Sequence, residues 1–216
     1  MTEYRYLLFD LDGTLTEPKV GITKSVAYAL EYYGIHVEDL DSLCPFIGPP
    51  LKESFMKYYG FDDEKAEEAV EKYREYFRPY GVYENEVYQG IPAMLKQLHG
   101  AGKTLVLATS KPTVFAKIIL EHFGLEPYFD VVVGSELDGT RVNKDEVVAC
   151  ALEEAGITDV SLAVMIGDRW HDIMGAKKNG LDSIGVLYGH GNREELETQG
   201  ADVIAETVEE LASILI

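Results

Sequence analysis

The sequence predicts an α/β fold, a doubly wound parallel sheet of the Rossmann-like type with an all-helical cap inserted after its first strand. Three observations lead to this prediction. Short apolar runs alternate with helix-length segments over most of the chain, which is typical of parallel strands joined by helices. Between residues 20 and 85 that alternation stops and the pattern is helical. The chain has 216 residues, 46% of them hydrophobic, which is enough for a sizeable core.

The strands are predicted from apolar runs of about five residues, the length of a buried strand. The first run, Tyr6–Phe9, ends directly before Asp10. The later runs are "TLVLA" (104–108), "FDVVV" (129–133), "LAVMI" (162–166) and "SIGVL" (183–187). Strands of this kind form a sheet that is buried on both faces.

The segments between these runs have the length and pattern of helices. We expect helices over Ile91–Ala101, Pro112–Phe123, Lys144–Ala155 and Arg169–Asn179. A glycine stands near the end of each segment (Gly102, Gly124, Gly156 and Gly180), where a helix often needs a residue in the left-handed conformation. In such a sheet, ligands bind at the carboxyl ends of the strands.

The interruption reads as two amphipathic helices, "GITKSVAYALEYYG" (21–34) and "DDEKAEEAVEKYREYF" (62–77), with no strand of the sheet's type between them. We therefore expect two domains: residues 1–16 and 86–216 as the α/β core, and residues 17–85 as a helical cap. The alternative, that these helices only cover one face of the sheet, stays open at this point.

Composition restricts the classes of partner. The formal net charge of −19 argues against a nucleic-acid polymer or an anionic membrane as partner. The start of the chain lacks the pattern of a secretory signal, and no apolar run reaches the ~18 residues of a membrane span. The two cysteines, Cys44 and Cys150, are read as free thiols in a reducing compartment. We expect a cytoplasmic protein, monomeric or a weak homodimer.

Polar side chains gather at four places, each at the end of a predicted strand or the start of a helix. The first is "DLDGT", with Asp10 and Asp12. The second is "TSK", with Thr109 and Ser110. The last two are "NKDEV", which contains Lys144, and "GDRWHD", which contains Asp168 and Asp172. The topology brings all four to one edge of the sheet.

These residue types fit the chemistry of phosphate esters. Asp10 is a candidate carboxylate nucleophile, and Asp12 is a candidate general acid and base. Asp168 and Asp172 add negative charge that suits a hard cation such as Mg²⁺, which prefers oxygen ligands. The cation would also reconcile the two like charges at Asp10 and Asp12.

The phosphate-binding candidates are Thr109, Ser110 and Lys144, which offer hydroxyl groups, backbone amides and an ammonium to phosphoryl oxygens. Each piece alone has an ordinary structural explanation. A threonine after a strand caps helices, a single lysine lies at the surface, and an aspartate stabilises the start of a helix. Their joint order along the chain is what indicates a catalytic site.

The segments "FDLDGTLT", "LATSKP", "NKDEV" and "MIGDRWHD" resemble the four ordered motifs of the haloacid dehalogenase-like hydrolase superfamily, over essentially the whole chain. The resemblance implies an aspartyl phosphate on Asp10 and acid–base catalysis by Asp12. It also implies Mg²⁺ held by Asp10, Asp168 and the backbone carbonyl of Asp12, with Asp172 in or just outside the metal shell. Lys144 would bind phosphate and restrain Asp10.

Within that superfamily the chain is most similar to the phosphoglycolate-phosphatase-like branch, and more narrowly to proteins classed as 5'-nucleotidase-like. The resemblance implies a phosphomonoester hydrolase acting on a small phosphorylated metabolite such as a nucleoside monophosphate, phosphoglycolate or a sugar phosphate. An acid at Asp12 argues against dehalogenation, which needs no proton for a leaving oxygen. A phosphomutase of the β-phosphoglucomutase type shares these residues and remains an alternative, as does a non-catalytic metabolite sensor.

Two candidate substrate residues lie in the inserted segment. "FIGPPLKESF" predicts a cap turn at Gly48 followed by a helix, and Lys52 in its first turn is placed to meet an anionic group of the substrate. A solvated lysine explains Lys52 equally well. Lys111 and Arg141, next to the motifs, are further sources of positive charge, but surface residues would look the same in the sequence.

Overall fold

The computed structural model describes residues 3–216, and the chain divides into two compact units. One unit contains the segments up to Glu17 and from Val87 to Ile216, and the other is Pro18–Glu86. The chain passes between them at the short strands β2 (Thr16–Glu17) and β3 (Glu86–Val87). Among the described residues, no helix combines the length and apolar character needed to cross a membrane.

The first unit is built on a parallel sheet of six strands, in the order β5-β4-β1-β6-β7-β8. Their bounds are β1 Tyr6–Phe9, β4 Thr104–Pro112, β5 Val131–Ser135, β6 Ala163–Gly167, β7 Asp182–Val186 and β8 Val203–Ala205. The predicted fold class, a doubly wound parallel sheet, is confirmed. The first strand β1 lies in the middle, hydrogen-bonded to β4 on one side and β6 on the other.

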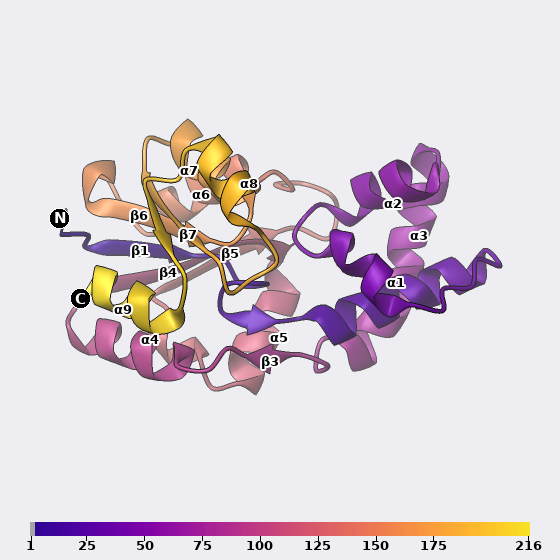
Figure 1. The fold of residues 1–216 in the computed structure, drawn as a ribbon, viewed down its shortest axis with the longest axis horizontal. Coiled ribbons are helices and arrows are strands. Elements are labelled where there is room, and N and C mark those ends of the chain that lie inside the picture. The colour runs from indigo at the N-terminus through magenta and orange to yellow at the C-terminus, as the bar shows by residue number, and fades with distance from the viewer. Residues whose placement is uncertain (1–2) are drawn as a thin grey trace. The chain divides into compact units, whose positions relative to one another are not determined.

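Helices cover both faces of this sheet (Figure 1). They are α4 Ile91–Gly100, α5 Thr113–His122, α6 Lys144–Glu154, α7 Trp170–Lys178, α8 Arg193–Gln199 and α9 Val208–Leu215. The helices α6, α7 and α8 lie on one side of the sheet in Figure 1, and α4, α5 and α9 lie on the other. Apolar side chains of α6 and α7 pack against β1, β4 and β6 in a fully buried core, which includes Leu8, Val106, Val147 and Met165.

Two predicted strands differ from the observed ones by two residues or more, and the predicted runs 162–166 and 183–187 are each displaced by one residue from β6 and β7. The strand predicted over 104–108 continues as β4 to Pro112, and its register with β5 shifts between Ala108 and Pro112. The strand predicted over 129–133 begins two residues later, at Val131, because Phe129 and Asp130 follow the short 3₁₀ turn Glu126–Tyr128. The end of the chain adds β8 and the helices α8 and α9, for which no prediction was made.

The second unit is helical. It contains α1 Lys19–Tyr32, the 3₁₀ segment Leu40–Phe46, α2 Leu51–Tyr59, α3 Asp63–Tyr76 and a π-helical turn over Phe77–Gly81. Aromatic side chains form its core: the rings of Phe46 and Phe55 are 5.0 Å apart, and Phe55 stacks on Phe61. That this unit acts as a cap is a functional expectation, which is taken up below.

Candidate active site

The four predicted segments meet at the carboxyl edge of the sheet. Asp10 follows β1 and Asp168 follows β6, and these two strands are hydrogen-bonded neighbours. Thr109 lies in the last part of β4, on the other side of β1. Lys144 is the first residue of α6, whose N-cap Asn143 completes a capping box with Glu146. The fold therefore brings together residues that are far apart in the sequence.

A tight turn after β1 fixes the two aspartates of the first motif. The backbone amide of Asp10 donates to the carbonyl oxygen of Ile166 at 2.9 Å, which ties the end of β1 to β6. The carbonyl oxygen of Leu11 accepts hydrogen bonds from the amides of Thr14, Leu15 and Thr16. Gly13 has a φ of +82°, a backbone conformation that residues with a Cβ rarely adopt. The turn thus holds Asp10 and Asp12 on a rigid backbone.

Three buried carboxylates lie close together at this edge. Asp10, Asp168 and Asp172 each offer an oxygen, and these oxygens all lie within 4.8 Å of one another. The ammonium of Lys144 is 2.8 Å from Asp10 Oδ1 and 2.7 Å from Asp172 Oδ1. The ammonium of Lys144 therefore pairs with two of the three aspartates, and the cluster keeps an excess of negative charge.

The protonation equilibria reflect that excess. Burial, with the nearby charges of Asp172 and Asp10, raises the pKa of Asp168 to about 7. Burial also raises the pKa of Asp172 to about 6, although Lys144 acts in the opposite direction. Burial disfavours the charge of Lys144, but Asp10 and Asp172 outweigh it, so the pKa of Lys144 lies above its usual value. A buried, electron-rich oxygen cluster of this kind fits a small divalent cation such as Mg²⁺.

Hydrogen bonds orient two of the three aspartates in the cluster. Asp168 Oδ2 accepts from the backbone amide of His190 at 2.8 Å, and Asp168 Oδ1 accepts from the Thr14 hydroxyl at 3.3 Å. Asp172 Oδ2 accepts from the amide of Arg169 at 3.0 Å, which caps the start of α7. Thr14 belongs to the first motif, but His190 lies beyond β7 in a loop that no motif marks.

Asp12 stands apart from the acidic cluster. Its Oδ2 forms an ion pair with Lys111 Nζ at 2.7 Å, and both side chains are buried. Burial raises the pKa of Asp12, with Lys111 acting against that effect. Asp12 Oδ1 is buried and accepts no hydrogen bond among the described residues. The side chain of Asp12 is thus available for a role other than metal binding, and its backbone carbonyl as a metal ligand stays a prediction.

The residues predicted to bind phosphate are buried or half-buried in the same unit. Thr109 is 1% exposed, and its hydroxyl accepts from the amide of Lys111 at 3.3 Å. The carbonyl oxygen of Ser110 accepts from the Ser135 hydroxyl at 2.7 Å, so β5 supports this segment. Lys144 is buried beside Asp10. The binding of phosphate by these residues stays a prediction.

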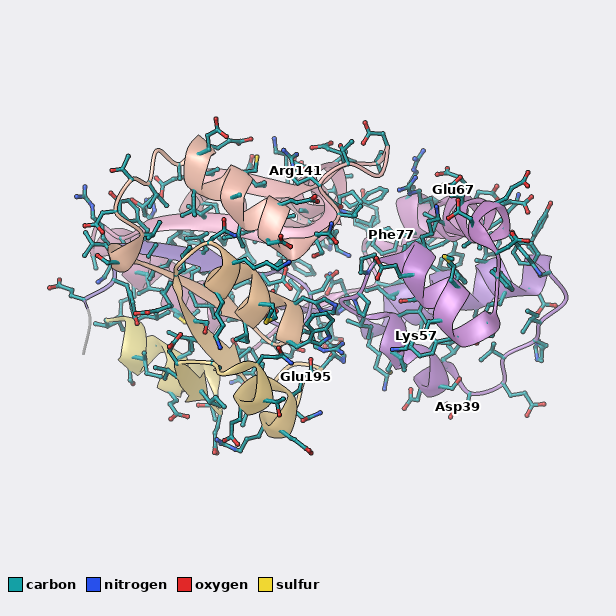
Figure 2. All side chains as sticks on the ribbon, turned by 90° about the horizontal axis from the view of Figure 1, so that it is seen from above. Asp39, Lys57, Glu67, Phe77, Arg141 and Glu195 are labelled. Atoms are coloured by element: carbon teal, nitrogen blue, oxygen red, sulfur yellow. The ribbon has the colours of Figure 1, made fainter. Side chains whose placement is uncertain are left out.

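The two candidate cap residues lie in the helical unit. Gly48 has a φ of +102° in the turn before α2. Lys52 Nζ is 2.8 Å from Asp63 Oδ1 and 2.7 Å from Glu67 Oε1, and Figure 2 labels Glu67 among the side chains of this unit. The charge of Lys52 is thus compensated within its own unit, and its contact with a substrate stays a prediction.

Glycine at position 167 is required by the packing around Asp172. A Cβ built on Gly167, the last residue of β6, would overlap the carboxyl group of Asp172, and the backbone of Gly167 has no positive φ. We expect Gly167→Ala to lower the free energy of unfolding by about 1–3 kcal/mol and to weaken Mg²⁺ binding at least tenfold. Thermal unfolding and calorimetric titration with Mg²⁺ would measure both effects.

The matched control is Gly100→Ala, where a new Cβ meets nothing within 4 Å. This change should leave Mg²⁺ binding unaltered and stability unchanged or slightly higher, since alanine favours a helix more than glycine does. Equal effects of the two substitutions would contradict the steric explanation.

The chain is similar to known proteins in both sequence and structure. The family profile described as haloacid dehalogenase-like hydrolase matches residues 7–186. A 5'-nucleotidase of Pseudomonas aeruginosa is 52% identical over 193 residues, 89% of this chain and 87% of its own length. Tyrosine-protein kinase PtkA of Mycobacterium tuberculosis is 38% identical over 97% of this chain and 72% of its own. The crystal structure of a predicted phosphatase from Clostridium acetobutylicum superposes with a TM-score of 0.95, at 55% identity over 98% of both chains.

Proposed function

The chain belongs to the haloacid dehalogenase-like hydrolases and is an enzyme of their phosphatase type; from this we propose that it is a Mg²⁺-dependent phosphomonoester hydrolase that works through an aspartyl phosphate on Asp10. The arrangement of Asp10 carries the proposal. Its carboxylate lies at the end of the central strand, beside Lys144 and within reach of Asp168 and Asp172, while Asp12 is held separately by Lys111.

In the first step, a carboxylate oxygen of Asp10 attacks the phosphorus atom and the bond from phosphorus to the ester oxygen breaks. Asp12 gives its proton to that oxygen, so that the alcohol leaves neutral. In the second step, water attacks the phosphorus of the aspartyl phosphate, and the Asp12 carboxylate takes a proton from the water. Orthophosphate leaves, and both side chains return to their starting states.

The carboxylates of Asp10, Asp168 and Asp172 would hold the metal, together with the backbone carbonyl of Asp12. Bound Mg²⁺ supplies positive charge against the phosphoryl oxygens and the buried aspartates. Lys144 keeps the Asp10 carboxylate in place through its ion pair. The hydroxyl of Thr109, the segment at Ser110 and Lys144 would bind the remaining phosphoryl oxygens.

The substrate is proposed to be a small phosphorylated metabolite, with nucleoside 5'-monophosphates first because the relative at 52% identity is named a 5'-nucleotidase. Phosphoglycolate and sugar phosphates are the other members of this class. We propose that the helical unit Pro18–Glu86 acts as the cap that selects among them, with Gly48 and Lys52 as candidate contacts. The proposed location is the cytoplasm.

The test measures phosphate release from a panel of these esters, with Mg²⁺ and with a chelator. We expect release from at least one ester, lost completely in the chelator and restored by Mg²⁺. The ranking of kcat/KM across the panel identifies the substrate class. A folded, Mg²⁺-loaded protein that releases phosphate from no ester would contradict the proposal and favour a metabolite sensor.

Phosphotransfer is the alternative that keeps the same chemistry at Asp10. It includes a phosphomutase of the β-phosphoglucomutase type and, in view of the relative named a tyrosine kinase, transfer to a phenolic hydroxyl. The rate at which the phospho-enzyme decays distinguishes a hydrolase from a phosphotransferase. Decay in water as fast as turnover supports the hydrolase. Decay accelerated many-fold by a sugar phosphate or a tyrosine peptide would favour a transferase.

A further inference from the structure

We propose that Lys111 is a positioning residue that, through Asp12, assists departure of the ester oxygen; this inference rests on the function proposed above. Lys111 Nζ lies 2.7 Å from Asp12 Oδ2, and the two side chains are only 5% and 11% exposed. A buried lysine ammonium is costly to desolvate and persists where a carboxylate compensates its charge. The pair is therefore a specific feature of the site and not a surface contact.

The ion pair distinguishes the two oxygens of Asp12. Oδ2 is held by Lys111, whereas Oδ1 is buried and has no hydrogen-bond partner among the described residues. An unpartnered buried oxygen is unfavourable unless a ligand completes it. With Oδ2 fixed, the proton that Asp12 transfers has one place left, Oδ1. Lys111 thus selects the oxygen that faces the leaving group.

The backbone of Lys111 is fixed by the end of β5. A Cβ on Gly134 would overlap the carbonyl oxygen of Lys111, so these two backbone segments lie in direct contact. The hydroxyl of Thr113 accepts from the amide of Gly134 at 3.0 Å, and the hydroxyl of Ser135 donates to the carbonyl oxygen of Ser110 at 2.7 Å. The register shift in β4 falls in this stretch. An irregularity of this kind re-aims a side chain, here toward Asp12.

The arrangement assists the reaction through charge. As the bond from phosphorus to the ester oxygen breaks, Asp12 loses its proton to that oxygen and becomes a carboxylate. The neighbouring ammonium of Lys111 stabilises the negative charge as it develops, so the interaction is stronger in the transition state than before it. Lys144 differs, because it pairs with Asp10 and Asp172. In the proposed mechanism Asp10 attacks the phosphorus atom, and both aspartates bind the metal.

This division of labour predicts a dependence on the leaving group. A nucleoside monophosphate releases an alkoxide, a strong base that needs a proton as it departs. p-Nitrophenyl phosphate releases a weakly basic phenolate that departs without one. A substitution that acts through Asp12 should therefore lower kcat/KM much more for the nucleotide than for p-nitrophenyl phosphate. A substitution that only loosens the fold should lower kcat/KM for both esters to the same extent.

The experiment compares Lys111→Met with the wild type on a nucleoside monophosphate and on p-nitrophenyl phosphate, in saturating Mg²⁺. We expect kcat/KM, which reports the step in which the ester oxygen departs, to fall about 100-fold for the nucleotide and less than tenfold for the aryl ester. Lys111→Arg, which keeps the charge, should recover part of the loss. The matched control is Lys144→Met, which removes the other buried lysine and should lower kcat/KM for both esters by the same factor.

A double-mutant cycle separates a positioning role from a structural one. In an Asp12→Asn background, Lys111→Met should change nucleotide hydrolysis less than threefold, because its route of action is gone. The double variant also removes the buried charge pair as a whole, so it is expected to fold even if Lys111→Met does not. Equal losses on both esters, or full additivity in the cycle, would overturn the inference. A wild-type protein inactive on both esters would overturn the proposed function and this inference together.

Discussion

Replacing Asp10 with asparagine is expected to lower phosphate release by about 10⁴-fold or more, to the detection limit. The amide has nearly the shape of the carboxylate but is not a nucleophile, so no covalent intermediate can form. Lys144 loses one ion-pair partner but keeps Asp172 at 2.7 Å, and the turn after β1 rests on backbone hydrogen bonds. The variant should therefore fold, and the loss should come from the chemistry.

Acid quenching with a ³²P-labelled ester makes this result specific. The wild type should retain label that is stable in acid and released by hydroxylamine, as an acyl phosphate is, and Asp10→Asn should retain none. The matched control is Asp145→Asn in the first turn of α6, which removes a carboxylate that pairs with Lys178 and leaves the cluster intact. Turnover of that control should stay within twofold of the wild type. Substantial phosphate release by Asp10→Asn would exclude Asp10 as the nucleophile.

The parts of the fold that the sequence predicted best are those where one local pattern decides the structure. The run Tyr6–Phe9 is observed as β1 with the predicted bounds, because four apolar residues end abruptly at a charged one. Lys144 begins α6 as expected, since Asn143 and Glu146 form the capping box that the local sequence encodes. The convergence of Asp10, Asp168, Asp172 and Lys144 follows from the parallel topology once the strands are placed.

The features that were missed or left open depend on contacts between distant segments. The sequence could not decide whether Lys111 adds positive charge at the site or lies at the surface, because its burial depends on Asp12, in the turn after β1, as its partner. The continuation of β4 to Pro112 depends on pairing with Ser135. His190 supports Asp168 with a backbone amide, which every non-proline residue carries, so its identity gives no signal. A glycine such as Gly167 is compatible with close packing, but only the structure shows that the carboxyl group of Asp172 occupies the space beside it.

Asp168→Asn is expected to act in opposite directions on activity and on the stability of the metal-free protein. Asp168 accepts one hydrogen bond at each oxygen, from the His190 amide and the Thr14 hydroxyl. Asparagine can accept the first with its oxygen and donate to the second with its amide, because a hydroxyl serves as donor or acceptor. The substitution therefore removes a buried negative charge and keeps the local bonding. It also removes a candidate metal ligand, and we expect kcat in Mg²⁺ to fall about 10³-fold.

The stability effect follows from the direction of the pKa shift. Burial, Asp172 and Asp10 raise the pKa of Asp168 to about 7 in the folded protein, against about 3.9 in an unfolded chain. Between these two values the folded protein holds a proton that the unfolded chain has released. The contribution of Asp168 to the free energy of unfolding of the metal-free protein therefore falls as the pH rises from about 4 to 7, and it stays low above that.

Asparagine cannot ionise, so Asp168→Asn should reduce this pH dependence and leave the part that comes from the raised pKa of Asp172. In chelator at pH 8 we expect the variant to unfold about 6 °C higher than the wild type, which corresponds to about 2 kcal/mol. In saturating Mg²⁺ the order should reverse, because the cation stabilises only the protein that binds it well. Thermal unfolding at pH 5, 6, 7 and 8, with and without Mg²⁺, measures all of these differences.

Asp145→Asn again provides the control, since its ion pair with Lys178 is partly exposed to solvent and lies outside the cluster, and its loss should leave the pH profile in chelator unchanged. A variant at position 168 that is less stable than the wild type in chelator at pH 8 would show that the buried charge is compensated without a metal. The expected outcome, a variant more stable than the wild type in chelator and less stable in Mg²⁺, would show that the charge of Asp168 needs a metal to compensate it. A carboxylate that destabilises the metal-free fold and stabilises the metal-bound one is retained for what it binds, and the acidic cluster is then a metal site by thermodynamic measurement, independent of any assay of activity.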